Sequence, residues 1–226
     1  MQVSEIVVVV PAHDEEELIG YCLAALRRAV DAVGVPVRVR VVLDDCRDAT
    51  ARLLPTWVEP VLCSVRNVGR ARALGFTGLR THPRAWFATT DADSEVPIDW
   101  LLAQLDSGRD HDVFVGTVRV TDWHRRAGGT ADRYAANYHP VVGHEHVHGA
   151  NLGISARAYH RLGGFEPRSL REDVALVAAA EKVGLSIDRS AAAPVVTSAR
   201  RSARTPGGFA ATLDRLEAQL GVGELL

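Results

Sequence analysis

Continuous apolar runs mark the first strands of the chain. Residues Ile6 to Val10 form an unbroken β-branched run that stops at Pro11. Val37 to Leu43, the stretch PVLCSV from Pro60, and Ala85 to Thr90 give further strand signals. A run without polar alternation is typical of a strand buried on both faces, as in a parallel sheet. We therefore expect four strands of such a sheet in the first 90 residues.

Segments with helical spacing separate these strands. Apolar side chains recur at helical intervals from Leu18 to Val33, after an acidic opening at Asp14, and Gly69 to Leu79 predicts a second helix. Alternating strands and helices are typical of a doubly wound α/β sheet with right-handed crossovers. Further helices are predicted after Pro97, over Ala156 to Leu162, over DVALVAAAEKVG from Asp173, and from Phe209 at the C-terminal end.

Polar turns follow three of the predicted strands. They are PAHDEEE after the first, DDCRDAT after the second and TTDADS after the fourth. Each turn alone is more often a helix cap than a site, because Asp and Ser are common at caps. Ligands of open α/β sheets, however, bind beyond the carboxyl ends of the strands. Three acidic turns at one edge therefore indicate a binding site.

Composition narrows the classes of protein. The 226 residues suit one large α/β domain, and the formal net charge of −2 gives no electrostatic footprint for nucleic acid. The three cysteines are widely spaced without a metal-binding pattern, which is typical of reduced thiols in a cytosolic protein. No apolar stretch approaches the length of a membrane span. We expect a cytoplasmic protein, and peripheral membrane association stays open.

The acidic turns favour a metal-bridged diphosphate. The chain lacks G-x-G-x-x-G after the first strand and lacks a Gly-rich turn that ends in Lys-Ser or Lys-Thr. Carboxylates cannot cradle phosphate directly, but they can hold a hard divalent cation that bridges to diphosphate oxygens. Asp91 and Asp93 are one residue apart at a strand end, so their side chains are expected to lie on one side.

Six motifs, taken in order, resemble the family-2 glycosyltransferases with the GT-A fold over roughly the first two hundred residues. They are VVVVPAHDEEE, VVLDDCRDAT, NVGRARALG, TTDADSEVPIDWL, GANLGISARAYHRLGGFEP and REDVALVAAA. The resemblance implies a single α/β domain with a mostly parallel, Rossmann-like sheet flanked by helices. Residues 1–95 would form the nucleotide-binding half and residues 96–226 the acceptor-binding half. It also implies a hexosyltransferase-like enzyme that uses a nucleotide-diphosphate sugar.

The resemblance assigns the nucleotide-sugar site to the first half of the chain. Asp44 matches the aspartate that recognises the base, although a plain turn-forming role stays open. Arg70 is a weaker match, because the family's later asparagine is replaced by Ala73 and an arginine on a helix is often solvated. The matched nucleotide-sugar positions are Pro11, Ala12, Glu15, Asp44, Asn67, Arg70, Asp91, Ala92, Asp93 and Glu172.

The resemblance also implies a Mg²⁺ or Mn²⁺ ion. Asp93 matches the direct metal ligand of the D-x-D element, and Asp91 matches the residue that contacts the ribose or a metal-bound water. The metal neutralises charge on the departing diphosphate. Several relatives supply a later metal-binding histidine, but no histidine follows His160 here. The remaining protein ligands of the ion are therefore not identified.

The second half is expected to hold the base and the acceptor. Asp173 matches the catalytic base of inverting members, although it and Glu172 also suit the first turn of a helix. Gly164 belongs to a loop that resembles the one closing on the donor sugar, where glycine permits close backbone approach. Gly149 and Asn151 match the part of the family that shapes the sugar and acceptor pockets.

Basic and imidazole side chains flank these motifs. The stretch HEHVH from His144 has the alternation of a zinc cluster, but hydrogen bonds to sugar hydroxyls are favoured, with His148 the best candidate. Arg200 and Arg201 are expected to offset diphosphate charge, although a solvated basic loop is nearly as good an interpretation.

The acceptor and the reaction type are less defined. The chain has no Q-x-x-R-W motif, which favours a single transfer to a small or carrier-linked acceptor over processive synthesis. A nucleotidyltransferase would need a basic Gly-rich loop where PAHDEEE stands. A non-catalytic sugar-nucleotide-binding partner protein could lack the base, whereas Asp173 is present. Inversion is inferred from family habit, and a homodimer stays open.

Overall fold

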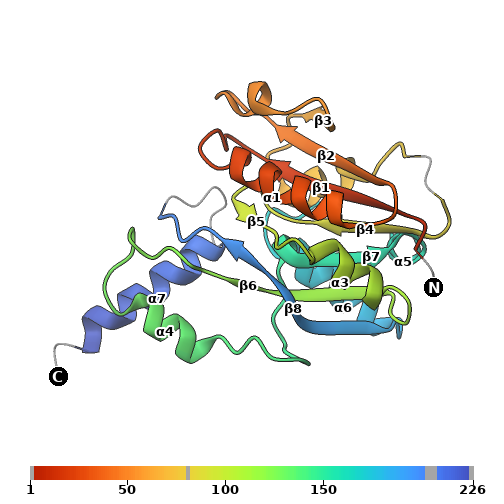
Figure 1. The fold of residues 1–226 in the computed structure, drawn as a ribbon. Helices are drawn as coiled ribbons and strands as arrows, with labels where there is room; N and C mark the ends of the chain where they lie inside the picture. Colours follow the sequence, from red (N-terminus) through yellow and green to blue (C-terminus); the bar gives the residue numbers. More distant parts are fainter. Residues whose placement is uncertain (1–2, 80–81, 202–207, 224–226) are drawn as a thin grey trace.

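The computed structural model of the chain describes residues 3–79, 82–201 and 208–223, which form a mixed α/β fold with helices on both faces of one curled sheet (Figure 1). The strands are β1 (Glu5–Ala12), β2 (Val37–Asp44), β3 (Val58–Cys63), β4 (Ala85–Thr89), β5 (Ser94–Glu95), β6 (Val113–Arg119), β7 (Leu152–Ser155) and β8 (Ile187–Thr197). The α-helices are α1 (Ile19–Ala32), α2 (Val68–Gly75), α3 (Trp100–Ser107), α4 (Thr130–Asn137), α5 (Ala156–Leu162), α6 (Glu172–Lys182) and α7 (Phe209–Gly223). Two 3₁₀ helices are η1 (Thr50–Leu53) and η2 (Gly149–Asn151). In these ranges no helix is both long and apolar enough to traverse a bilayer.

The sheet combines a parallel half with a mixed half. Within the described ranges its strand order is β3-β2-β1-β4-β7-β6-β8-β5. Strands β3, β2, β1 and β4 run parallel, as do β6 and β8, whereas β7 lies antiparallel between β4 and β6 and β5 lies antiparallel to β8. The predicted single α/β domain with a mostly parallel sheet is therefore confirmed, and the short strands β5 and β7 are its antiparallel members.

The central strand β1 is covered on both faces, which explains its unbroken apolar run. Ile6, Val8 and Val10 pack in one apolar core together with side chains of α1 and α3. Val7 and Val9 pack in a second core together with side chains of α2, α5 and α6. Because both faces of β1 exclude water, polar side chains at alternate positions would lose their hydration when the chain folds.

Two predicted helix boundaries differ from the structure. The first helix begins at Ile19, well after Asp14. The Asp14 carboxylate instead accepts hydrogen bonds from the backbone N–H groups of Arg47 and Asp48, and Glu16 accepts one from Ala49. The acidic opening thus organises the neighbouring turn after β2. The second helix ends at Gly75, because Phe76 turns into the core and stacks on Phe87.

Two glycines in helical first turns give a matched stability test. An added Cβ at Gly69 would lie 2.2 Å from the backbone oxygen of Glu166, whereas at Gly20 nothing lies within 4 Å. We expect Gly69→Ala to lower the free energy of unfolding by about 1–3 kcal/mol through overpacking. Gly20→Ala should raise it by up to about 1 kcal/mol through helix propensity. Urea denaturation measures both, and equal effects would contradict the close packing at Gly69.

Candidate active site

A cavity of about 890 Å³ lies beyond the carboxyl ends of β1, β2 and β4. Segments far apart in the sequence meet in it: the strand-end turns of the first half, η2, the start of α6 and the chain after β8. The predicted site residues that line it are Pro11, Ala12, Glu15, Asp44, Asn67, Asp91, Ala92, Asp93, His148, Gly149, Glu172, Asp173 and Arg200. The fold therefore brings most of the sequence-predicted residues to one place.

The Asp44 carboxylate organises the loop that leads into α2. Its Oδ1 accepts hydrogen bonds from the backbone N–H groups of Val65 at 2.7 Å and Arg66 at 2.9 Å, and its Oδ2 accepts one from Asn67 at 3.1 Å. Asn67 in turn caps α2, because its side chain accepts a hydrogen bond from the backbone of Arg70. Asp44 is buried, so these contacts fix the cavity wall beside it.

Replacing Asp44 is expected to destabilise the protein. Asp44→Ala leaves three partly buried backbone donors without their acceptor. Water can replace part of each lost hydrogen bond, so we expect a loss of about 1–3 kcal/mol of unfolding free energy in total. The matched control is Asp45→Asn at the neighbouring position. The Asp45 carboxylate pairs with the exposed side chains of Arg47 and Arg66, so this substitution should lower the free energy of unfolding by less than about 1 kcal/mol. Chemical denaturation of both variants measures the difference. Equal losses would show that Asp44 does not organise the loop.

Asp91 and Asp93 lie between β4 and β5, and each is paired with an arginine. Asp91 Oδ1 accepts a hydrogen bond from Arg72 Nη2 at 2.5 Å, and Asp93 Oδ2 lies 3.0 Å from Arg200 Nη2. Burial raises the pKa of Asp93 above the ordinary range of an aspartate, Arg200 opposes this effect, and Asp91 and Glu15 add to it. The ionised form of Asp93 is therefore disfavoured chiefly because the carboxylate is buried.

The aspartate pair fits a divalent cation in the chemistry of its donors. Carboxylate oxygens are the ligands that Mg²⁺ and similar hard cations prefer, and Mg²⁺ commonly takes one or two of them together with substrate phosphates. Over the described ranges no group of three His, Cys, Asp or Glu side chains is arranged to hold a metal ion. The two aspartates thus suit an ion that a diphosphate helps to bind. The same result gives no support for a zinc cluster in HEHVH.

Arg72 links residues from the two halves of the chain, although no local pattern favours it over Arg70. Its side chain is only 3% exposed and forms ion pairs with Asp91 and Glu172. Its Nε also donates to Thr89 Oγ1 at 3.2 Å, whereas Arg70 is exposed and lies outside the cavity lining. Because Arg72 is surrounded by residues distant in the chain, no local pattern distinguishes it from a solvated arginine.

Asp173 stands in the first turn of α6 and faces the cavity. Its Oδ2 accepts a hydrogen bond from the backbone N–H of Gly149 at 2.7 Å, and its Oδ1 accepts one from the N–H of Val174. Gly149 is packed tightly, because an added Cβ there would lie 2.4 Å from Arg72 Nη2. The carboxylate of Asp173 is therefore held in a defined position beside η2.

Aromatic side chains form another part of the cavity wall. Tyr138 stacks between Tyr134 and His146, with ring centroids 5.0 and 4.1 Å apart, and Phe209 of α7 approaches Tyr134 edge-on. The Tyr138 hydroxyl lies 3.0 Å from Nε2 of His148. Burial lowers the pKa of His148 to about 3, with His146 and His144 contributing. His148 is thus a neutral imidazole in this wall at physiological pH.

Asn151 has a structural environment. It is completely buried, its Nδ2 donates to the backbone oxygens of Thr117 and Ala193, and its Oδ1 accepts a hydrogen bond from Trp100 Nε1 at 2.8 Å. These contacts join η2 to β6, β8 and α3. Asn151 therefore supports the cavity from behind and does not line it.

Two further predicted residues lie outside the cavity. Gly164, with a φ of +80°, packs against Tyr159 and lines a separate hollow of about 350 Å³. Arg201 is exposed and pairs with Glu217 of α7 at 3.1 Å. The side chains of the two neighbouring arginines thus have different partners, since Arg200 contacts Glu15 and Asp93 in the cavity whereas Arg201 contacts Glu217.

The chain resembles a known protein family in sequence and solved structures in fold. The sequence profile described as "Glycosyl transferase family 2" matches residues 7–165. No curated protein matches the chain significantly. Among solved structures, residues 1–349 of TarS from S. aureus in complex with UDP-GlcNAc superpose with a TM-score of 0.66 at 14% identity, over 91% of this chain and 61% of that one.

A second solved structure is similarly close in fold. The mannosyltransferase PcManGT from Pyrobaculum calidifontis, in complex with GDP-Man and Mn²⁺, has a TM-score of 0.66 at 19% identity, over 92% of this chain and 59% of that one. The chain therefore spans about 60% of the length of each of these two solved structures.

Proposed function

Since the chain belongs to glycosyl transferase family 2, we propose that it transfers a sugar from a nucleotide-diphosphate sugar to an acceptor hydroxyl. One observation carries the proposal: Asp44, Asp91, Asp93 and Asp173 come from three separate motifs and line one cavity of about 890 Å³. A cavity of this size suits a ligand as large as a nucleotide-sugar.

The first half of the chain, residues 1–95, is proposed to bind the donor. Pro11, Ala12 and Asp44 line the end of the cavity where the base and ribose would lie, and the carboxylate of Asp44 can accept a hydrogen bond from a base N–H. Asn67 lines the cavity next to Asp44, and Glu15 lines it beside Arg200, which also contacts Asp93. Because Asp44 also holds the backbone of residues 65–67, base binding and loop order would depend on the same side chain.

The diphosphate is proposed to lie at the aspartate pair. Asp93, with Asp91 beside it, would hold a Mg²⁺ or Mn²⁺ ion, which supplies Lewis-acid neutralisation of the diphosphate charge. Arg200 lies next to Asp93 and can donate to phosphate oxygens through its planar guanidinium. Arg72 keeps Asp91 oriented, because its own guanidinium is held by a second ion pair with Glu172.

Asp173 is proposed as the catalytic base of an inverting transfer. Its carboxylate would take the proton of the acceptor hydroxyl as that oxygen attacks the anomeric carbon and the bond to the diphosphate breaks. The hydrogen bond from the Gly149 N–H leaves acceptor capacity on Asp173, since each carboxylate oxygen has two lone pairs. Glu172 would stand beside the sugar while its charge is balanced by Arg72.

The acceptor is proposed to enter through residues 96–226. The aromatic wall of Tyr134, Tyr138, His146 and Phe209, with His148 behind the Tyr138 hydroxyl, lines that part of the cavity. Such a wall suits a small or carrier-linked acceptor that presents an apolar surface. A hexosyl donor and a cytoplasmic place of action belong to the same proposal, and peripheral association with membranes stays open.

Turnover of a donor panel tests the proposal. The purified chain is incubated with UDP-, GDP-, dTDP- and CDP-sugars and Mg²⁺ or Mn²⁺, and release of the nucleoside diphosphate is followed. UDP-GlcNAc and GDP-mannose come first, because the two similar structures contain them. We expect at least one donor to bind and to be hydrolysed slowly without an acceptor. Neither binding nor hydrolysis of any donor would contradict the proposal.

A further inference from the structure

Arg200 occupies a central place among the carboxylates of the cavity. Its Nη1 and Nη2 donate to the two carboxylate oxygens of Glu15 at 2.6 and 2.8 Å, and Nη2 also lies 3.0 Å from Asp93 Oδ2. The three side chains are largely buried, with exposures of 18% for Arg200, 6% for Glu15 and 14% for Asp93. In this geometry the guanidinium is the counter-ion of both carboxylates.

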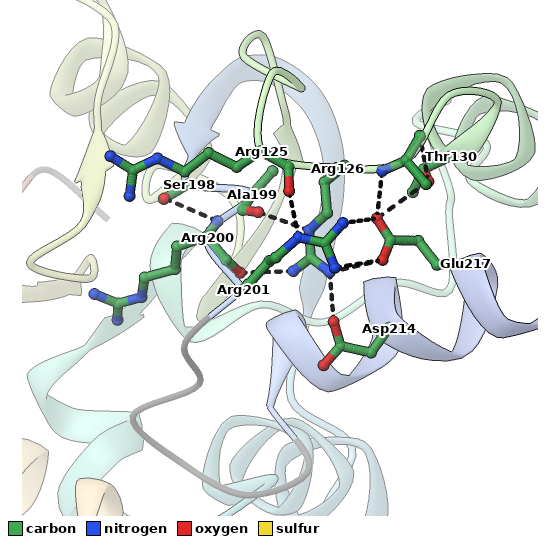
Figure 2. A network of polar contacts seen from close by, with 10 residues as sticks. Arg125, Arg126, Thr130, Ser198, Ala199, Arg200, Arg201, Asp214 and Glu217 are labelled. Carbon is green, nitrogen blue, oxygen red and sulfur yellow. Dashed lines mark hydrogen bonds and ion pairs between the residues drawn. The ribbon is translucent and has the colours of Figure 1, made fainter.

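The backbone of Arg200 is fixed by a second arginine. Arg126 is fully buried, and it donates from Nε to the oxygen of Ala199 at 2.7 Å and from Nη2 to the oxygen of Arg200 at 2.6 Å (Figure 2). Its Nη1 pairs with Asp214 of α7. With the main chain held in this way, the Arg200 side chain can move while its attachment point stays in place.

The neighbouring Arg201 is held differently. Its Nε donates to the backbone oxygen of Arg125, and its Nη1 pairs with Glu217 (Figure 2). Glu217 also accepts hydrogen bonds from the backbone N–H of Ala127 and from Thr130. Arg201 therefore belongs to the contact between α7 and the chain before α4, which makes it a matched control for Arg200.

A metal ion and the Arg200 guanidinium cannot both bind the Asp93 carboxylate without repelling each other. A divalent cation bound to Asp93 would stand within a few ångströms of the guanidinium, and at this separation like charges repel strongly in a partly buried site. The planar guanidinium is also well shaped for bidentate contact with phosphate. Displacement from Asp93 would therefore leave Arg200 with a new partner once a diphosphate is present.

We propose that Arg200 is a built-in counter-ion of the cation site: its guanidinium holds Asp93 and Glu15 in the ligand-free chain, and an entering divalent cation displaces it from Asp93. The later contact of Arg200 with the diphosphate rests on the proposed function, whereas the competition between Arg200 and the cation for Asp93 does not. Arg126 is the positioning residue that keeps Arg200 within reach of both partners.

Mn²⁺ binding without nucleotide tests the competition. The wild-type chain and the variants Arg200→Gln, Arg200→Lys and Arg201→Gln are titrated with Mn²⁺, and free Mn²⁺ is followed by electron paramagnetic resonance. We expect Arg200→Gln to bind Mn²⁺ about tenfold more tightly than the wild type, because a competing positive charge is gone. Arg200→Lys and Arg201→Gln should stay within about threefold of the wild type, because both keep a positive charge beside Asp93.

The outcomes separate the inference from the proposed function. If Arg200→Gln binds Mn²⁺ no more tightly than the wild type, or if Arg201→Gln gains as much, the inference is overturned. UDP and GDP titrations at saturating Mn²⁺ form the second arm, in which Arg200→Gln should lose about tenfold in affinity for the nucleotide that the wild type binds. Failure of the proposed function would remove nucleotide binding in every variant and leave the Mn²⁺ difference in place.

Discussion

Asp173→Asn is expected to lower kcat for sugar transfer by about 10²- to 10⁴-fold, the contribution typical of a general base. The amide cannot take the acceptor proton, but its oxygen can still accept the hydrogen bond from the Gly149 N–H, which leaves the hydrogen bond from the Val174 N–H as the one local contact that is lost. Donor affinity should change by less than about threefold, because the base acts on the acceptor. Steady-state kinetics of transfer, with donor binding measured by calorimetry, gives both values.

The control for Asp173 is an acid on the same helix. Glu181 lies near the end of α6 and pairs with Arg189, and it is absent from the cavity lining. Glu181→Gln should keep full transfer. If Asp173→Asn keeps full transfer as well, another group acts as the base and the proposed mechanism is wrong.

Asp93→Asn is expected to have the second large effect, a loss of about a hundredfold or more in kcat/KM for the donor. The substitution removes the charge that would hold the cation at the diphosphate. Mn²⁺ affinity should fall together with kcat/KM. Retained Mn²⁺ binding and transfer in Asp93→Asn would show that the cation lies elsewhere.

The same variant should be more stable than the wild type when no ligand is bound. The pKa of Asp93 is raised in the folded chain, chiefly by burial, so the folded state disfavours the ionised form relative to the unfolded state. That cost is present at neutral pH, decreases as the pH falls from the folded-state pKa towards the lower pKa of the unfolded chain, and is absent below both. Urea denaturation at pH 8 should therefore show a higher unfolding free energy for Asp93→Asn, which separates lost function from lost folding.

The parallel half of the sheet could be predicted because its strands carry their own signal. The runs at β1 and β4 are apolar at nearly every position, and both strands are buried on both faces. The acidic turns that follow them are local as well, so Asp91 and Asp93 could be selected with no knowledge of the fold. Strand β7, of four residues, is too short for a pattern, and its antiparallel place follows from its neighbours β4 and β6.

The residues that link the motifs could not be predicted. Arg72 and Arg126 are both buried, yet their partners lie far away in sequence: Glu172 for Arg72, and Ala199 and Asp214 for Arg126. A sequence pattern read locally treats each as a solvated arginine. The role of Asp14 was missed for the same reason, since it bonds to the turn after β2 and leaves α1 without a side-chain cap.

The most direct measurement is a crystal structure of the chain with Mn²⁺ and the nucleoside diphosphate of the donor that it turns over. The proposed function predicts that the nucleobase lies beside Pro11 and Asp44 and that the diphosphate lies at Asp93 and Arg200. It also predicts that Mn²⁺ is bound to Asp93. The carboxylate of Asp173 would then face the β-phosphate, to which the sugar of the donor is attached. A nucleotide bound outside this cavity, or a diphosphate that lies away from Asp93, would contradict the assignment of the site.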